Sequence, residues 1–143
     1  MILKKVHFPF FYLLLILCSL FSCESNVKKH PTYLALFGKA ELNFENAKFD
    51  SAFYYYQKTK VFCHSQNDFN NIIYPILMMS EIQRLKNDFS GSEATVTEAI
   101  KYLKKDTKKS YYTFIYNNLG LAYLEQSNYN EANKYYYKSL EIT

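Results

Sequence analysis

Nucleophilic and metal-ligating residues are few in this chain and are not spaced for catalysis. The histidines are His7, His30 and His64, and only His64 has a cysteine beside it, Cys63. An adjacent pair of this kind lacks the ligand spacing of zinc sites. The serines of Ser90-Gly91-Ser92 open an expected helix instead of following a strand, which is unlike a nucleophile elbow. The residues therefore predict no catalytic site, no metal and no cofactor.

The N-terminal segment has the composition of an export signal. Lys4 and Lys5 precede an almost wholly apolar run over residues 8–21. A membrane-spanning helix needs about twenty apolar residues, and Pro9 interrupts the shorter run present here. The pattern is typical of a signal peptide over residues 1–22.

Cys23 stands at the end of this segment, where acylation chemistry is expected. The sequence Leu20-Phe21-Ser22-Cys23 resembles the lipobox of bacterial lipoproteins. That resemblance implies a lipid on Cys23, attachment to the membrane through this anchor, and a place in the bacterial cell envelope facing the periplasm. Residues 23–31 then form the lipidated cysteine and a flexible leash. The alternative is an ordinary secretory signal with an incidental cysteine.

Composition limits the rest of the chain to one small domain. Of its 143 residues 49% are apolar, and it has only three glycines and three prolines, as expected of helices joined by tight loops. The net charge of +4 includes Lys4 and Lys5, so about +2 remains without them. That excess is too small to indicate a nucleic-acid partner.

A repeated turn pattern predicts the architecture. An aromatic residue stands three places before a small one three times, forty residues apart, in Phe49-Asp50-Ser51-Ala52, Phe89-Ser90-Gly91-Ser92 and Tyr129-Asn130-Glu131-Ala132. Each copy lies between two helical stretches. The sequence therefore predicts an all-α fold, a short α-solenoid of about three helix-turn-helix repeats over residues 32–143. The units are expected at about 33–72, 73–112 and 113–143.

Turn residues divide this region into six expected helices. Wider loops are expected between the pairs, at residues 64–70 and 106–110. Asp50, Ser90 and Asn130 follow the turn aromatics and are expected to cap the second helices. The expected helices cover residues 32–46, 49–64, 71–86, 90–105, 110–126 and 130–142.

The third copy resembles the tetratricopeptide repeat. Its signature positions carry Tyr116, Leu119, Gly120, Tyr123, Tyr129, Ala132, Tyr136 and Leu140. In this pattern Gly120 and Ala132 let the paired helices approach, while Tyr123, Tyr129 and Tyr136 fill the remaining space. The first two copies match less completely, and the forty-residue spacing exceeds the customary thirty-four of the family.

The resemblance also implies a ligand site. Ligands of this family usually lie in a concave groove lined by the first helix of each pair. A mixed groove with an acidic fringe suits an amphipathic or basic peptide, so we expect a non-catalytic scaffold that binds a protein or peptide. The corresponding residues are Phe37, Glu41, Phe44, Tyr74, Leu77, Glu81, Arg84, Leu85, Asn117, Leu121 and Leu124.

The last repeat leaves two further questions open. No polar helix follows Tyr136 and Leu140, so we expect that a second copy in a homodimer or another partner covers this face, or that the chain once continued. The repeat phrases are also similar to the N-terminal regions of signalling proteins from Bacteroidetes-type bacteria. The alternative function is therefore the truncated sensor region of a histidine kinase or helix-turn-helix regulator.

Overall fold

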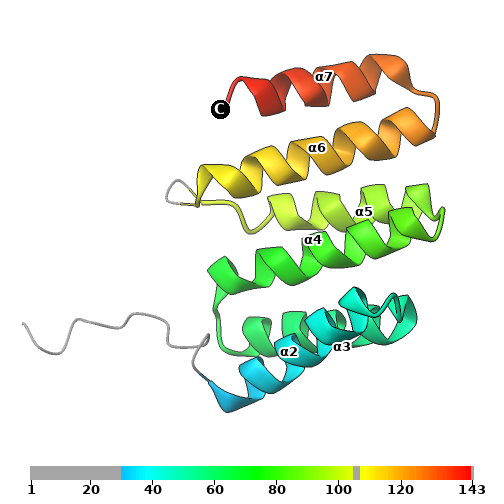
Figure 1. The fold of residues 1–143 in the computed structure, drawn as a ribbon. Coiled ribbons are helices and arrows are strands. Elements are labelled where there is room, and N and C mark those ends of the chain that lie inside the picture. Colours follow the sequence, from blue (N-terminus) through cyan, green and yellow to red (C-terminus); the bar gives the residue numbers. More distant parts are fainter. Residues whose placement is uncertain (1–29, 105–106, 143) are drawn as a thin grey trace, which may run out of the picture.

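The described part of the chain is entirely helical. The computed structural model describes residues 30–104 and 107–142, and these form six α-helices and no strand (Figure 1). The expected all-α fold is thereby confirmed. Predictions for residues 1–29, including the signal peptide and Cys23, lie outside the described residues. In chain order the helices are α2 (Pro31–Glu45), α3 (Phe49–Ser65), α4 (Phe69–Leu85), α5 (Phe89–Ile100), α6 (Lys109–Glu125) and α7 (Tyr129–Leu140).

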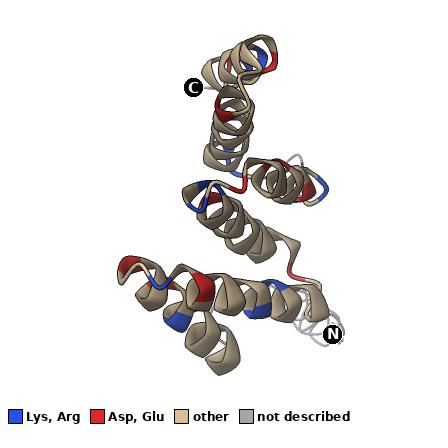
Figure 2. Ribbon diagram, turned by 90° about the vertical axis from the view of Figure 1, so that its right-hand side faces the viewer, with Lys and Arg blue, Asp and Glu red and all other residues tan. Residues whose placement is uncertain are grey.

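Successive helices run back and forth and pack on one another. Each helix contacts its neighbours in the sequence, and α4 also contacts α6, which is not its neighbour (Figure 1). Charged residues are spread along the helices and turns instead of gathering on one element (Figure 2). None of the described helices has the length and apolar character needed to cross a membrane.

Four of the five connections are the same tight turn. Each has one non-glycine residue with positive φ: Ala47 (54°), Asn67 (54°), Asn87 (63°) and Ser127 (58°). In each turn the next N–H donates to the carbonyl oxygen five residues earlier, at 2.8–2.9 Å, as in a Schellman motif. The turn between α3 and α4 is one of them. The wider loop expected at residues 64–70 is therefore wrong, because Asn67 accepts the left-handed conformation and lets α4 start at Phe69.

The helix caps lie one residue before the turn aromatics. Asp88 accepts from the N–H of Gly91 at 2.9 Å, and Asn128 accepts from that of Glu131 at 3.4 Å. Asp68 caps α4 in the same way. The expected caps Asp50, Ser90 and Asn130 are wrong, because the aromatic residue before each is already the first residue of its helix.

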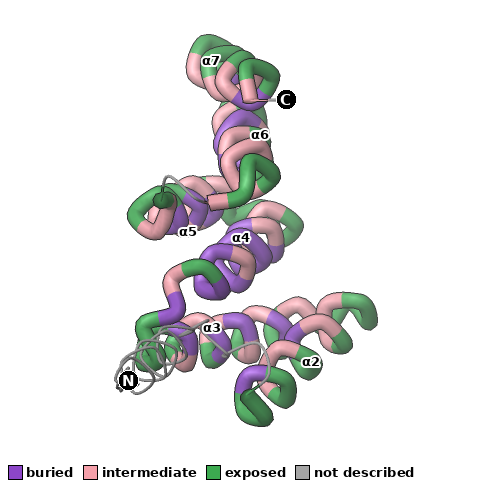
Figure 3. The backbone as a smooth tube through the Cα atoms, turned by 90° about the vertical axis from the view of Figure 1, so that its left-hand side faces the viewer, coloured by how far each residue is buried: buried purple, intermediate pink, exposed green. Residues whose placement is uncertain are grey.

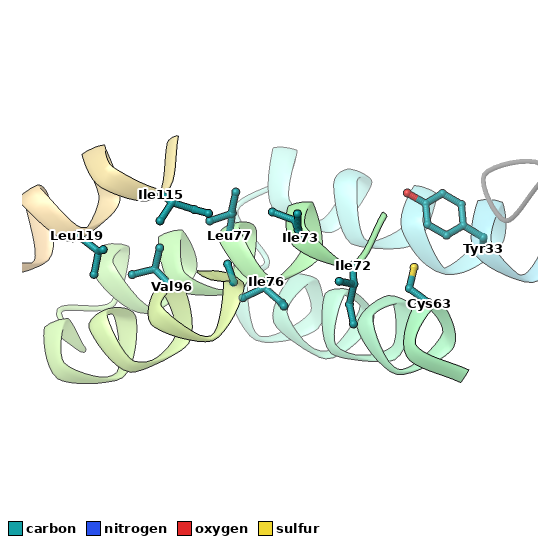
Figure 4. Packing of buried hydrophobic residues seen from close by; sticks show 10 residues of the cluster. Tyr33, Cys63, Ile72, Ile73, Ile76, Leu77, Val96, Ile115 and Leu119 are labelled. Carbon is teal, nitrogen blue, oxygen red and sulfur yellow. The ribbon is translucent and has the colours of Figure 1, made fainter. Parts of the chain in front are cut away.

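Helix α4 is the centre of the hydrophobic core (Figure 3). Its N-terminal half contributes Ile72, Ile73, Ile76 and Leu77 to a cluster with residues of α2, α3, α5 and α6 (Figure 4). Its C-terminal half contributes Met78, Met79 and Ile82 to a second cluster with α2 and α3. One helix thus holds both halves of the molecule together.

The third pair closes by a small residue against a large one. A Cβ on Gly120 would lie 2.5 Å from Cε1 of Tyr136, so the two helices meet where glycine leaves room. Tyr123 stacks on Tyr135 with ring centroids 5.5 Å apart and donates to Glu93 of α5 at 2.6 Å. Tyr129 is exposed, so the expectation that it fills the gap between these helices is wrong.

Candidate ligand-binding face

The expected ligand residues of α2 face the neighbouring helices. The ring of Phe37 lies 5.6 Å from that of Tyr74 in α4 and 6.5 Å from that of Tyr56 in α3. Phe44 lies 5.9 Å from Phe49 and is partly buried against the second core cluster. Both side chains therefore combine a packing role with a remaining exposed edge.

Glu41 is held among tyrosines. Its carboxylate accepts a hydrogen bond from the hydroxyl of Tyr56. Burial raises the pKa of Tyr56, and this bond to Glu41 raises it further. Burial also raises the pKa of Tyr74, with the negative charge of Glu41 as the next cause. Glu41 consequently brings a negative charge to the place where α2, α3 and α4 meet.

The expected residues of α4 fall into three environments. Leu77 is buried in the core, so the surface that a ligand can reach does not include it. Glu81 and Arg84 form an ion pair with Oε1 and Nη2 2.6 Å apart. This bond is the main cause that raises the pKa of Arg84, and Glu125 of α6 adds to it. Leu85 is 43% exposed.

The expected residues of α6 lie further along the molecule. Asn117 and Leu124 are exposed, and Leu121 is half-buried. Asn117 borders an open pocket of about 440 Å³ together with Phe114 and Ile142. The predicted residues thus follow one series of helices without converging on a single cavity.

A smaller pocket joins three of the helices. It has a volume of about 140 Å³ and is lined by Tyr33 and Phe37 of α2, Asn71 and Tyr74 of α4, and Tyr111 of α6. Phe37 and Tyr74 were among the expected residues, whereas the other three were not. The sequence signal that could have identified these three is their shared position, because Tyr33, Asn71 and Tyr111 are each the third residue of their helix.

Asn71 is fixed in this pocket by a buried acid. Asp68 is 2% exposed and accepts from the backbone N–H of Asn71 at 3.2 Å and from its amide nitrogen at 2.6 Å. One of the two amide N–H donors of Asn71 is used in this way, so the second N–H and the carbonyl oxygen remain. The pocket therefore has one polar amide group among its aromatic lining residues.

Cys63 lies in the core close to the pocket, next to Tyr33 (Figure 4). Burial raises the pKa of its thiol to about 12, and the charge of Asp68 contributes. Since the thiolate is the reactive form, the structure indicates an inert thiol. Among residues 30–104 and 107–142 no group of three His, Cys, Asp or Glu side chains could hold a metal ion.

We expect Cys63 to resist thiol reagents until the protein unfolds. With an aromatic disulfide reagent at pH 8, the difference in thiol release between the full chain and the Cys63→Ala variant should be negligible at first. It should reach one equivalent per chain in denaturant. Rapid labelling of Cys63 in the native protein would contradict the buried position.

The raised pKa of Cys63 predicts that the folded protein loses stability at alkaline pH. The folded pKa of about 12 exceeds the unfolded value of about 8.5, so the unfolded chain releases its proton first. The contribution is complete below about pH 8.5 and is lost as the pH rises toward 12. Denaturant titrations of the full chain and of Cys63→Ala between pH 7 and 10 should show a steeper decline in the former. Parallel declines would contradict the prediction.

No protein-family model matches this chain, and no curated protein matches it. The resemblance to the tetratricopeptide repeat therefore rests on the signature residues of the sequence alone.

Proposed function

We propose that this chain is a non-catalytic scaffold that binds a protein or peptide. In this proposal it is a short solenoid of three tetratricopeptide-like helix pairs, held at the bacterial cell envelope by a lipid on Cys23. The support for the anchor is the lipobox-like sequence Leu20-Phe21-Ser22-Cys23 after an apolar segment.

Repeated geometry supports the solenoid. The pairs α2 with α3, α4 with α5 and α6 with α7 each contain the same turn, with the positive φ at Ala47, Asn87 and Ser127, forty residues apart. The contact of α4 with α6 brings the first helices of adjacent pairs together, as stacking of repeats requires.

One observation carries the binding proposal. The first helices α2, α4 and α6 jointly line a pocket, so residues far apart in the sequence contribute to one face. Further along these first helices lie Glu41 of α2 and Glu81 of α4, which are half-buried, and Leu85 of α4, which is exposed. A rigid face of aromatic, aliphatic and acidic groups suits a peptide segment with apolar and basic side chains.

The test is a charge placed on this face. We expect the double variant Phe44→Asp, Leu85→Asp to lose the partner that the full chain captures from envelope membranes, while its helical content is unchanged. Leu85→Asp alone is the cleaner variant, because Leu85 is exposed and Phe44 is partly packed. Capture is measured by cross-linking and quantitative mass spectrometry.

Val61→Asp is the matched control. Val61 is an exposed aliphatic residue like Leu85, but it lies on α3, a second helix. A partner that is lost with Leu85→Asp and retained with Val61→Asp supports the assigned face. Equal capture by all three variants and the original chain would refute it.

A further inference from the structure

We propose that the small pocket between α2, α4 and α6 binds the cationic end of an arginine or lysine side chain from a basic peptide. This inference rests on the proposed function, because the pocket belongs to the same face, and it adds the chemistry of the ligand.

Four aromatic rings form the walls. Tyr33 stacks on Phe37 with ring centroids 5.3 Å apart, and Phe37 lies 5.6 Å from Tyr74. Tyr111 lines the pocket from α6. The volume of about 140 Å³ corresponds to roughly five waters at about 30 Å³ each, which suits the end of one side chain and not a drug-sized ligand. A cation placed over the face of an aromatic ring is attracted to it.

The charges next to these rings are negative. Asp68 is almost fully buried and bonded to Asn71, and Glu41 accepts from Tyr56 beside Tyr74. Within the part of the chain that the structure describes, neither carboxylate takes part in an ion pair. A buried negative charge without a cationic partner is costly, so a cation bound nearby would be stabilised.

The pKa of Tyr33 also indicates negatively charged surroundings. After burial, the causes that raise the pKa of Tyr33 are all acidic groups: Cys63, Tyr111, Asp68 and Glu41. A lysine or arginine near this phenol would lower its pKa, and none is among these main causes. The electrostatic complement that the pocket lacks is therefore a positive charge.

Elsewhere the chain supplies its own cations to aromatic faces. Lys104 lies 5.2 Å from the centroid of Phe69, and Lys138 lies 5.1 Å from that of Tyr135. The two larger pockets also contain lysines, Lys109 in one and Lys86 in the other. No such contact to the four pocket rings occurs among residues 30–104 and 107–142. This aromatic site is left for a cation from outside.

The experiment compares two peptides that differ in charge. The full chain is titrated with the N-acetylated, C-amidated tripeptide Gly-Arg-Gly, and with the same peptide carrying citrulline, the neutral isostere of arginine. We expect ring currents to move the arginine δ-proton resonances upfield on binding. The dissociation constant of the citrulline peptide should be roughly tenfold larger, since a desolvated cation–π contact contributes about 1–2 kcal/mol.

Variants locate the site. Tyr111→Leu should reduce the upfield shift, because one of the four rings is lost. Glu41→Gln, which keeps the shape of the side chain, should weaken binding of the arginine peptide alone. Tyr137→Leu is the control, because Tyr137 is 67% exposed on α7 and lies outside the pocket. Circular dichroism confirms that each variant is folded.

Three outcomes would overturn the inference: no binding at millimolar peptide, equal affinity for the two peptides, or an unchanged shift in Tyr111→Leu. Each of these outcomes can be distinguished from failure of the proposed function. If the arginine peptide fails while Leu85→Asp still abolishes partner capture, the face is correct and the ligand chemistry is wrong. If the arginine peptide does not bind and Leu85→Asp leaves partner capture unchanged, the ligand chemistry and the proposed function are both wrong.

Discussion

Ile76→Ala is expected to lower the free energy of unfolding by about 2–5 kcal/mol. Ile76 is 0% exposed and lies in α4 among buried residues from α3, α5 and α6. Truncation to alanine removes three buried carbon atoms, so the favourable free energy of their transfer from water is lost. It also leaves a cavity that the surrounding helices can only partly fill. Because α4 contributes to both core clusters, it cannot shift to fill the cavity in one cluster without disturbing the packing of the other. The measurement is urea unfolding followed by far-UV circular dichroism.

Leu85→Ala is the matched control on the same helix. Leu85 is 43% exposed, so its truncation should cost well under 2 kcal/mol. Alanine favours the helix slightly more than either residue that it replaces, and this small gain acts in both variants. A cost for Ile76→Ala no larger than that for Leu85→Ala would mean that α4 is not the centre of the core.

The helices could be predicted because their boundaries are local. Phe49, Phe89 and Tyr129 each mark the first residue of a helix, and the small residue three places later is buried against the partner helix. These features recur with a fixed spacing that can be read from the sequence. The wrong caps differ from the true ones by two positions, which is the usual uncertainty of a helix end.

The turn between α3 and α4, predicted as a wider loop, also has a local signal in the sequence. Asn67-Asp68-Phe69 repeats Asn87-Asp88-Phe89 twenty residues earlier. Both segments place asparagine at the positive φ and aspartate at the cap. The spacing of forty residues marks pairs of helices, whereas the local turn sequence repeats after twenty residues at this point.

The candidate pocket was only half predictable. Phe37 and Tyr74 follow from the family resemblance, but Tyr33 and Tyr111 lie near the starts of their helices, where the sequence does not reveal what they face. Whether such a residue lines a pocket depends on how α2, α4 and α6 cross. That crossing is set by contacts between helices that are not neighbours in the sequence, such as α4 with α6, so it has no local signal.

Gly120→Ala and Gly38→Ala are expected to change stability in opposite directions. Neither glycine has a positive φ, so neither is required by the backbone. The Cβ added at position 120 would lie 2.5, 2.7 and 2.9 Å from three ring carbons of Tyr136. The added methyl group must push α7 from α6 or force the tyrosine from its rotamer, at a cost of roughly 1–3 kcal/mol.

At position 38 the added Cβ has no neighbour within 4 Å, so only helix propensity and the entropy of the unfolded chain remain. Gly38→Ala should therefore raise the free energy of unfolding by about 0.4–1 kcal/mol. The same substitution thus separates the effect of space from that of propensity, with urea midpoints as the measurement. Gly120→Ala, Tyr136→Leu supplies the remaining test, because removing the ring should recover part of the loss. If Gly120→Ala stabilised the protein as much as Gly38→Ala, the close approach of α6 and α7 at Tyr136 would be refuted.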